Sequence, residues 1–110
     1  MTHAEGIDTI AGMYGTTGSY SHAEGNGVSA IGYTSHAEGY KTTASGSTSH
    51  SEGNSTEASG AASHAEGYKT TASGDYSHAE GNATSATAEY SHAEGNGSVV
   101  SGLWSHAEGY

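Results

Sequence analysis

The sequence predicts an all-β parallel solenoid, and three observations carry this prediction. The motif Ser-His-Ala-Glu-Gly recurs with a constant step of 14 residues from Ser21 to Ser105, and a short fixed period is the signature of stacked coils. The 14-residue unit divides into two similar halves, as in Ser63–Tyr76, where each half has Ala and Gly two residues apart. The chain has no Phe and one Trp, so its interior must be built from small side chains.

The motif occurs in six identical copies and two near copies. The identical copies are Ser21–Gly25, Ser35–Gly39, Ser63–Gly67, Ser77–Gly81, Ser91–Gly95 and Ser105–Gly109. Thr2–Gly6 is a near copy that begins with Thr, and Ser49–Gly53 is a near copy with Ser51 in place of Ala. All eight histidines of the chain belong to these copies, so whatever histidine does here is repeated along the molecule.

The unit Ser63–Tyr76 shows how one coil is expected to fold. Its halves read SHAEGYK and TTASGDY. Five residues of each half suit a short strand, and the glycine with its neighbours suits the following turn. A helical heptad is disfavoured because glycine, serine and threonine are poor helix formers and no large apolar residues fill the a and d positions. Each 14-residue unit is therefore expected to form one flattened coil of two strands and two turns.

Residues 1–20 depart from the period, and we expect them to form an atypical N-terminal coil or cap. Thr9–Gly15 resembles half a unit and Thr16–Tyr20 a shortened one, while Ile7 and Ile10 make the segment more apolar than the rest. Solenoids need terminal caps that close their stacked core. Residues 21–110 then form the repeating β-roll, and the whole chain is one domain.

Strand alternation assigns the side chains of each coil to an inner and an outer side, because residues i, i+2 and i+4 of a strand share a face. A flat coil has room inside only for small side chains. The expected interior of one unit consists of Ser63, Ala65, Gly67, Thr70, Ala72 and Gly74. The expected outward residues are His64 and Glu66 on the first strand, and Thr71 and Ser73 on the second.

The two outward faces differ in how strictly they repeat. The first carries His and Glu in every copy, whereas one position of the second carries Thr43, Glu57, Thr71, Ser85 and Val99. Coils stack about 4.8 Å apart, so like residues form columns. A column of carboxylates repels itself, and imidazoles that donate hydrogen bonds to it make the column tolerable.

We therefore expect the first face to pack against another copy of the chain, because closed symmetry brings equivalent surfaces together. The expected subunit interface consists of His22, Glu24, His36, Glu38, His50, Glu52, His64, Glu66, His78, Glu80, His92, Glu94, His106 and Glu108. In this interpretation the His/Glu columns hold the subunits in register.

Ser, His and Glu in sequence also suggest a hydrolase triad, but the expected geometry argues against one. Ser63 and His64 are neighbours on a strand and point to opposite sides, whereas a triad needs the serine Oγ within hydrogen-bond reach of the imidazole. We predict no catalytic residues, no enzymatic activity and no cofactor.

Metal binding is a second interpretation of the histidine column, since three imidazoles from three chains at one level would resemble a facial ligand set. The candidate ligands are His22, His36, His50, His64, His78, His92 and His106. A ladder of His–Glu hydrogen bonds explains the same residues without a metal, and the sequence favours that ladder.

The strong negative charge of the chain limits its partners. The formal net charge is −10, and Lys41 and Lys69 are the only Lys or Arg residues. Nucleic acids and anionic membranes select basic surfaces, and no apolar run approaches the roughly 20 residues of a membrane span. Acid is expected to loosen an assembly held by this face, because protonated glutamates no longer balance charged histidines.

The cadence S-x-A-x-G-x-x-x-x-A-x-G resembles the head repeats of trimeric autotransporter adhesins, the YadA-like heads. Val28–Gly32 is close to the S-V-A-I-G strand of that family, and the resemblance extends from Thr2 to Tyr110. It implies a left-handed parallel β-roll, three chains around one axis and a role in surface attachment. In such heads the apolar pair of S-V-A-I-G lines the trimer axis, where this chain has the His and Glu of S-H-A-E-G.

The sequence thus predicts a non-enzymatic adhesive or structural head or rod of a bacterial surface fibre, located outside the cell or on its surface. The expected partners are copies of the chain itself, in a homotrimer or fibre, and a host matrix protein or glycan. Nucleic acid and membrane insertion are not expected. The alternatives are a segment of a phage tail fibre within a virion, a self-assembling extracellular filament and, from the outward Thr and Ser ladder, an ice-binding solenoid.

Overall fold

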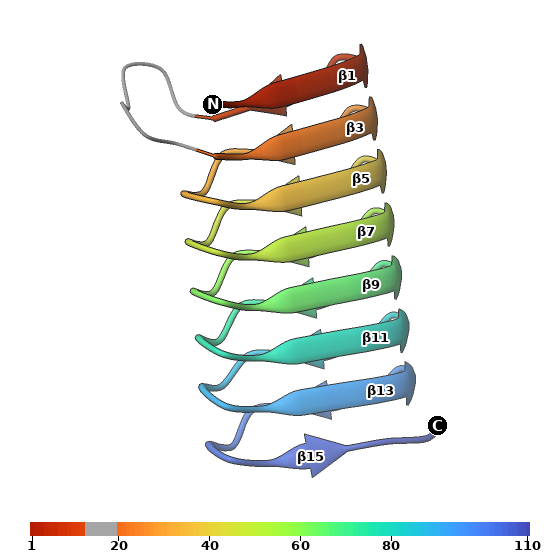
Figure 1. Cartoon of the computed structure of the whole chain (residues 1–110). Coiled ribbons are helices and arrows are strands. Elements are labelled where there is room, and N and C mark those ends of the chain that lie inside the picture. The colour runs from red at the N-terminus through yellow and green to blue at the C-terminus, as the bar shows by residue number, and fades with distance from the viewer. Residues whose placement is uncertain (13–19) are drawn as a thin grey trace.

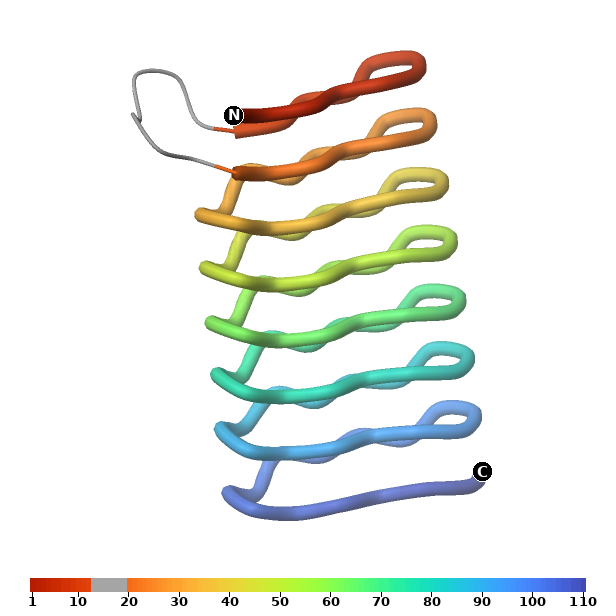
Figure 2. The backbone as a smooth tube through the Cα atoms, in the orientation of Figure 1, coloured from red at the N-terminus to blue at the C-terminus, as the bar shows by residue number. Residues whose placement is uncertain are grey.

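A computed structural model describes residues 1–12 and 20–110 and shows a flat, parallel β-solenoid (Figure 1). The backbone makes successive flattened coils that stack along one axis, as the tube in Figure 2 shows. The Cα extents are 39 × 23 × 12 Å, and the smallest of them reflects two thin sheets placed back to back. The predicted all-β parallel solenoid, with one 14-residue coil of two strands per repeat, is confirmed.

Each coil contributes one strand to each of two sheets, except the last, which contributes β15 alone. The eight-stranded sheet contains β1 (His3–Ile7), β3 (His22–Asn26), β5 (His36–Tyr40), β7 (His50–Asn54), β9 (His64–Tyr68), β11 (His78–Asn82), β13 (His92–Asn96) and β15 (His106–Ala107). The seven-stranded sheet contains β2 (Ile10–Ala11), β4 (Ser29–Ala30), β6 (Thr43–Ala44), β8 (Glu57–Ala58), β10 (Thr71–Ala72), β12 (Ser85–Ala86) and β14 (Val99–Val100).

All strand pairs are parallel, and equivalent positions of successive coils are aligned. His78 is opposite His64 on one side and His92 on the other. The same register brings β1 onto β3, where His3 is opposite His22 although the sequence interval is longer there. Each strand position of the unit therefore forms a column along the stack.

The second strand of each coil is shorter than expected, with only two residues in β10. The chain turns immediately afterwards: Ser77 donates two hydrogen bonds to the carbonyl of Gly74, from its backbone N–H at 3.2 Å and from its Oγ at 2.6 Å. The same two hydrogen bonds join Ser49 to the Gly46 carbonyl and Ser63 to the Gly60 carbonyl. This local turn competes with the ladder and limits the strand to its Thr-Ala pair.

The interior is built from small side chains, as the alternation predicted. Ala65 and Ala72 are fully buried, as are their equivalents in most coils, and Ser63 and Thr70 lie beside them with at most 2% of their surface exposed. Val28 is the largest fully buried side chain among the described residues. A core this thin gains little free energy per residue from apolar burial, so the backbone ladders carry much of the stability.

Gly67 corrects the predicted interior, because it is exposed instead of lying inside the coil. Its φ of +110° is strained for other residues, and a Cβ there would lie 2.1 Å from the carbonyl oxygen of Gly81 in the next coil. The missing side chain would thus point along the stack, and the glycine permits close stacking of the coils. Gly74 of the second half is buried as predicted.

The N-terminal coil continues the stack, with β1 on β3 and β2 on β4. Its apolar residues Ile7 and Ile10 are 65% and 55% exposed, so neither enters the interior. The predicted half unit Thr9–Gly15 is described only as far as Gly12. All but the last residue of the predicted short unit Thr16–Tyr20 lies outside the described residues, and the role of this segment as a cap stays a prediction.

No helix in the described part of the chain is long and apolar enough to cross a membrane.

Candidate functional site: the His/Glu face

The outer surface of the eight-stranded sheet carries the motif's histidines and glutamates, and we call these two columns the His/Glu face. In β9, His64 and Glu66 point away from the buried Ala65 between them. Their side chains are 36% and 34% exposed. The face is therefore open to a partner, although each side chain is shielded by its equivalents in adjacent coils.

The imidazoles form one continuous stack whose regularity changes along the molecule. From His50 to His106 the ring centroids of neighbours lie 4.6–4.7 Å apart and the ring planes are within 3° of parallel. Between His3 and His50 the planes are inclined by 19–35°. The predicted columns are confirmed, and the regular part begins at His50.

Each histidine faces the glutamate of its own coil, and this pair loosens along the chain. Hydrogen bonds of 3.2–3.3 Å join Nε2 and Oε2 in the pairs His3–Glu5, His22–Glu24 and His36–Glu38. From His50 to His92 the same distance is 3.5–3.7 Å. The Nε2 atoms of His50, His64, His78 and His92 are shielded from solvent and have no hydrogen-bond partner. Within the described residues of the single chain, the His–Glu hydrogen bond of each coil is thus present only in the first coils, and the predicted ladder between subunits stays a prediction.

Glutamates near the C-terminal end also face the histidine of the following coil. Glu94 places Oε2 at 3.7 Å from Nε2 of His92 and Oε1 at 3.5 Å from Nε2 of His106. Glu80 likewise lies 3.9 Å from His92 through its Oε1. A single carboxylate therefore lies between two imidazoles in successive coils.

The central imidazoles favour the neutral form. The pKa values of His50, His64 and His78 are lowered from the ordinary value of 6.5, first by burial and then by the adjacent imidazoles, while nearby glutamates partly offset the shift. Removing a charged ring from water is unfavourable, and two charged rings in contact repel each other. Neutral histidines therefore accompany the carboxylates in these coils, in place of the charged histidines assumed from the sequence.

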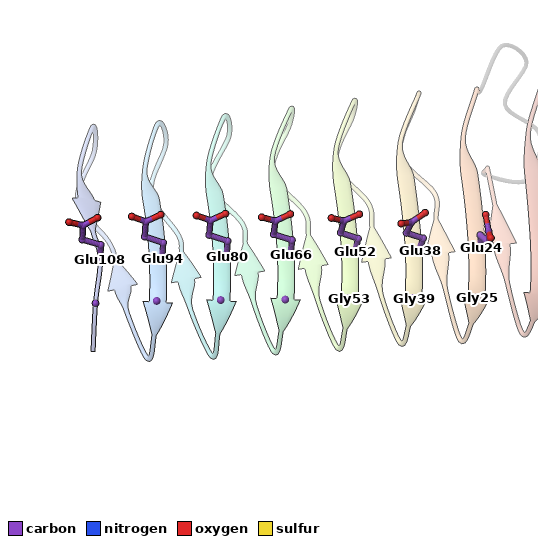
Figure 3. Close-up of a pocket in the computed structure, with 14 residues that line it drawn as sticks. Glu24, Gly25, Glu38, Gly39, Glu52, Gly53, Glu66, Glu80, Glu94 and Glu108 are labelled. Atoms are coloured by element: carbon purple, nitrogen blue, oxygen red, sulfur yellow. The ribbon is translucent and has the colours of Figure 1, made fainter.

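A groove runs beside the glutamate column and has a volume of about 1090 Å³. Figure 3 shows the carboxylates from Glu38 to Glu108 in one row with a common orientation, whereas that of Glu24 is turned. The lining residues are Glu24, Gly25, Glu38, Gly39, Glu52, Gly53, Glu66, Gly67, Glu80, Gly81, Glu94, Gly95, Glu108 and Gly109. The sequence contained the signal for it, since a glycine column beside a column of long side chains leaves a furrow.

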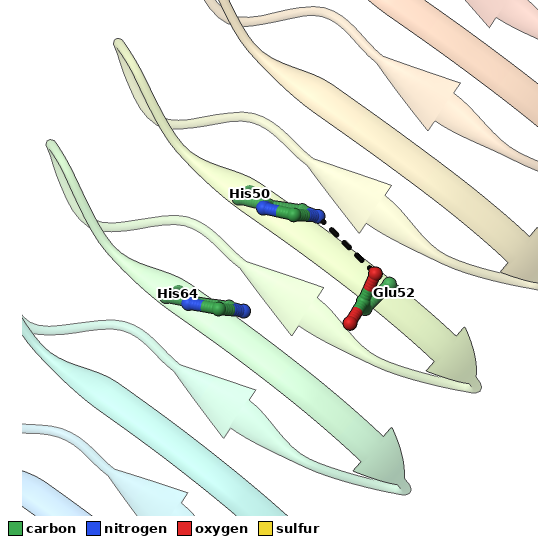
Figure 4. A group of neighbouring side chains, drawn as sticks. All are labelled: His50, Glu52 and His64. Carbon is green, nitrogen blue, oxygen red and sulfur yellow. Dashed lines mark ion pairs between the residues drawn. The ribbon is translucent and has the colours of Figure 1, made fainter.

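Three sets of two imidazoles and one carboxylate bring their ligand atoms within 4.8 Å of one another. They are His50–Glu52–His64, His64–Glu66–His78 and His92–Glu94–His106. Figure 4 shows the first set, with the His50 and His64 rings parallel on successive strands and Glu52 paired with His50. Of the seven histidines considered as metal ligands, these sets include His50, His64, His78, His92 and His106, and within the described residues they leave out His22 and His36.

The serine of each motif lies on the other side of the sheet from the imidazole. Ser63 is buried and its Oγ donates a hydrogen bond to the Gly60 carbonyl at 2.6 Å, while His64 lies on the outer face. The serine thus closes the turn between coils and is not within reach of its neighbouring histidine. This geometry confirms the opposite orientation predicted for the two side chains.

Exposed aromatic rings form a smaller column at the turns that end three successive coils near the C-terminal end, at Tyr76, Tyr90 and Trp104. Tyr76 and Tyr90 stack with centroids 5.0 Å apart, and Tyr90 and Trp104 stack at 4.1 Å. Their backbones have φ near +58°, a conformation that disfavours most side chains. The rings cover one another across successive coils and thereby support these turns.

No known protein family matches the sequence, and no curated protein is significantly similar to it.

Proposed function

We propose that this chain is a non-enzymatic structural rod that assembles with copies of itself through the His/Glu face. The observation that carries the proposal is a contrast within the motif Ser63–Gly67. The fold explains three of its five residues, because Ser63 closes a turn, Ala65 fills the interior and Gly67 permits stacking. It does not explain His64 and Glu66, which are half-exposed and whose equivalents are nevertheless His and Glu in every copy.

A partner with the same period accounts for that repetition. The His and Glu columns have a fixed spacing along the stack, so a second copy of the chain presents matching donors and acceptors at every level. Closed symmetry joins such equivalent faces without leaving one exposed.

The resemblance to the YadA-like heads supports a more specific proposal, namely a homotrimer that forms the adhesive head or rod of a bacterial surface fibre. In this arrangement the His/Glu columns replace the apolar pair along the trimer axis. The outward second sheet and the turns remain free to contact a host matrix protein or glycan. The location would then be extracellular, at the cell surface.

Sedimentation of the purified chain tests self-association. We expect a particle of three chains for the wild type, and a shift towards single chains for His64→Ala that exceeds the shift for Thr71→Ala on the opposite sheet. A wild-type protein that sediments as a single chain at all concentrations would overturn the proposal. Equal effects of the two substitutions would show that the face has been assigned to the wrong sheet.

Electron microscopy of the same samples separates this function from the filament alternative. Discrete rods of uniform length are expected for a trimeric head. Fibres that lengthen with protein concentration would instead indicate a self-assembling extracellular filament, in which coils of different chains stack end to end.

A further inference from the structure

We propose that the regular part of the His/Glu face binds divalent transition-metal ions of the Zn²⁺ class, with two imidazoles of successive coils and the carboxylate between them as ligands. All three ligands of each site belong to one chain, so the inference does not rest on the proposed self-association. Imidazole nitrogen together with a carboxylate oxygen is a preferred donor set for Zn²⁺, whereas Ca²⁺ and Mg²⁺ prefer oxygen ligands alone.

The distribution of hydrogen bonds along the face supports these sites. The histidines of the first coils, His3, His22 and His36, bond to their own glutamates, and within the described residues none of them belongs to a ligand set. The four Nε2 atoms without a hydrogen-bond partner, on His50, His64, His78 and His92, all belong to such sets. The Nε2 atoms that lack a hydrogen bond thus lie in the part of the face that contains the ligand sets.

The set around Glu94 is the best prepared. Its two oxygens face different imidazoles, at 3.7 Å from His92 and 3.5 Å from His106, and the two rings are 4.6 Å apart. With Zn–N bonds of about 2.0–2.1 Å, two nitrogens of a tetrahedral site lie about 3.3 Å apart. The nitrogens of the two parallel rings must therefore approach each other, and both rings must turn until their Nε2 lone pairs converge on one ion.

Binding also requires a particular tautomer. The imidazole proton must be on Nδ1, which leaves the Nε2 lone pair for the metal. No hydrogen bond is lost in this tautomer at His50, His64, His78 and His92, because their Nε2 atoms have no hydrogen-bond partner. The two imidazoles and the carboxylate leave at least one coordination position for water. The strong negative charge of the chain, −10, further favours a cation along this face.

The shared histidine limits the number of ions. His64 belongs to the sets of both Glu52 and Glu66, and its Nε2 can bind only one metal ion. The set of Glu94 shares no residue with either. The structure therefore predicts two ions per chain at saturation.

Equilibrium dialysis against buffered Zn²⁺, with the bound metal measured by atomic emission, tests this inference on the full chain. We expect two ions per wild-type chain, one for Glu94→Gln and two for Glu24→Gln. Glu24 provides the matched control because it has the same place in its coil but belongs to no ligand set in the described residues. Circular dichroism verifies that each variant keeps its β-structure.

Imidazole NMR resonances of the wild type provide a second measurement that needs no variant. Substoichiometric Zn²⁺ is expected to shift the signals of His92 and His106 before those of His3 and His22. Absence of saturable binding, equal losses in Glu94→Gln and Glu24→Gln, or uniform shifts of all histidines would overturn the sites. Sedimentation in the presence of a chelator reports separately on self-association, so either proposal can fail without the other.

Discussion

The two sheets of the solenoid stack with the same period, yet their outer faces differ in sequence. On the eight-stranded sheet His and Glu are present in every copy, whereas one outward position of the seven-stranded sheet is Glu57 in β8, Thr71 in β10 and Val99 in β14. Val99 is 64% exposed and the coil is not disturbed by it. The seven-stranded sheet thus shows that coil stacking tolerates charge, hydroxyl and branched apolar side chains at an outward position.

This comparison separates what the fold requires from what it merely permits. Repetition of Ala79 and Gly81 follows from space, since Ala79 is fully buried inside the coil and a Cβ on Gly81 would collide with the next coil. Repetition of His78 and Glu80 on the surface has no such cause. We propose that a binding partner, either a second chain or a metal ion, is the reason for it.

Replacing a residue that the fold requires should have the largest effect on stability. Gly81→Ala would place a Cβ 2.1 Å from the carbonyl oxygen of Gly95 at a φ of +110°, so the next coil must move away. We expect the free energy of unfolding to fall by about 3 kcal/mol or more, measured by urea denaturation.

Gly97→Ala is the matched control for that substitution. Gly97 has a φ of +75°, but a Cβ there would have open space around it, with no contact within 4 Å. Ala83 already occupies the equivalent place with a φ of 57°. The loss should be about 1 kcal/mol. Similar losses in the two variants would mean that stacking of the coils does not explain the glycine column.

Acid should destabilise the His/Glu face before it affects the outer face of the seven-stranded sheet. Because the pKa values of His50, His64 and His78 are lowered in the folded chain, the unfolded chain binds protons first as the pH falls. Stability is thus fully present above about pH 6.5 and decreases as the pH falls through that value towards the lowered pKa values. We expect a lower melting temperature at pH 5.5 than at pH 8 in metal-free buffer.

In a triple variant that has asparagine in place of all three histidines, we expect the melting temperature to depend less on pH between pH 5.5 and pH 8. An unchanged or higher melting temperature of the wild type at pH 5.5 would contradict the neutral state of the histidines. The sequence alone attributed acid sensitivity to the glutamates, and the lowered histidine pKa values move its expected onset to higher pH.

A substitution on the tolerant face should have the smallest effect. Ser85→Val reproduces on β12 the residue that β14 has as Val99, so we expect the free energy of unfolding to change by less than about 0.5 kcal/mol. Sedimentation should also be unchanged. A large loss of stability or of self-association would show that the outer face of the seven-stranded sheet is as constrained as the His/Glu face.

The period predicted the coil, its two strands and the columns, because parallel register follows directly from identical units. Other features depend on local hydrogen bonds that a pattern does not encode. The second strand ends just before the turn in which Ser77 bonds to the Gly74 carbonyl, and Gly67 is exposed and has a positive φ. The orientation of Glu94 between two imidazoles depends on side-chain torsion angles, which a repeat pattern does not determine.

Disulfide trapping tests most directly the central claim that the His/Glu face meets another copy of the chain. The chain contains no cysteine, so Glu66→Cys and Ser73→Cys place single thiols on the outer surfaces of the two sheets. Under mild oxidation we expect covalent dimers of Glu66→Cys at concentrations that leave Ser73→Cys monomeric on non-reducing gels. Equal cross-linking of the two variants, or faster cross-linking of Ser73→Cys, would contradict the account.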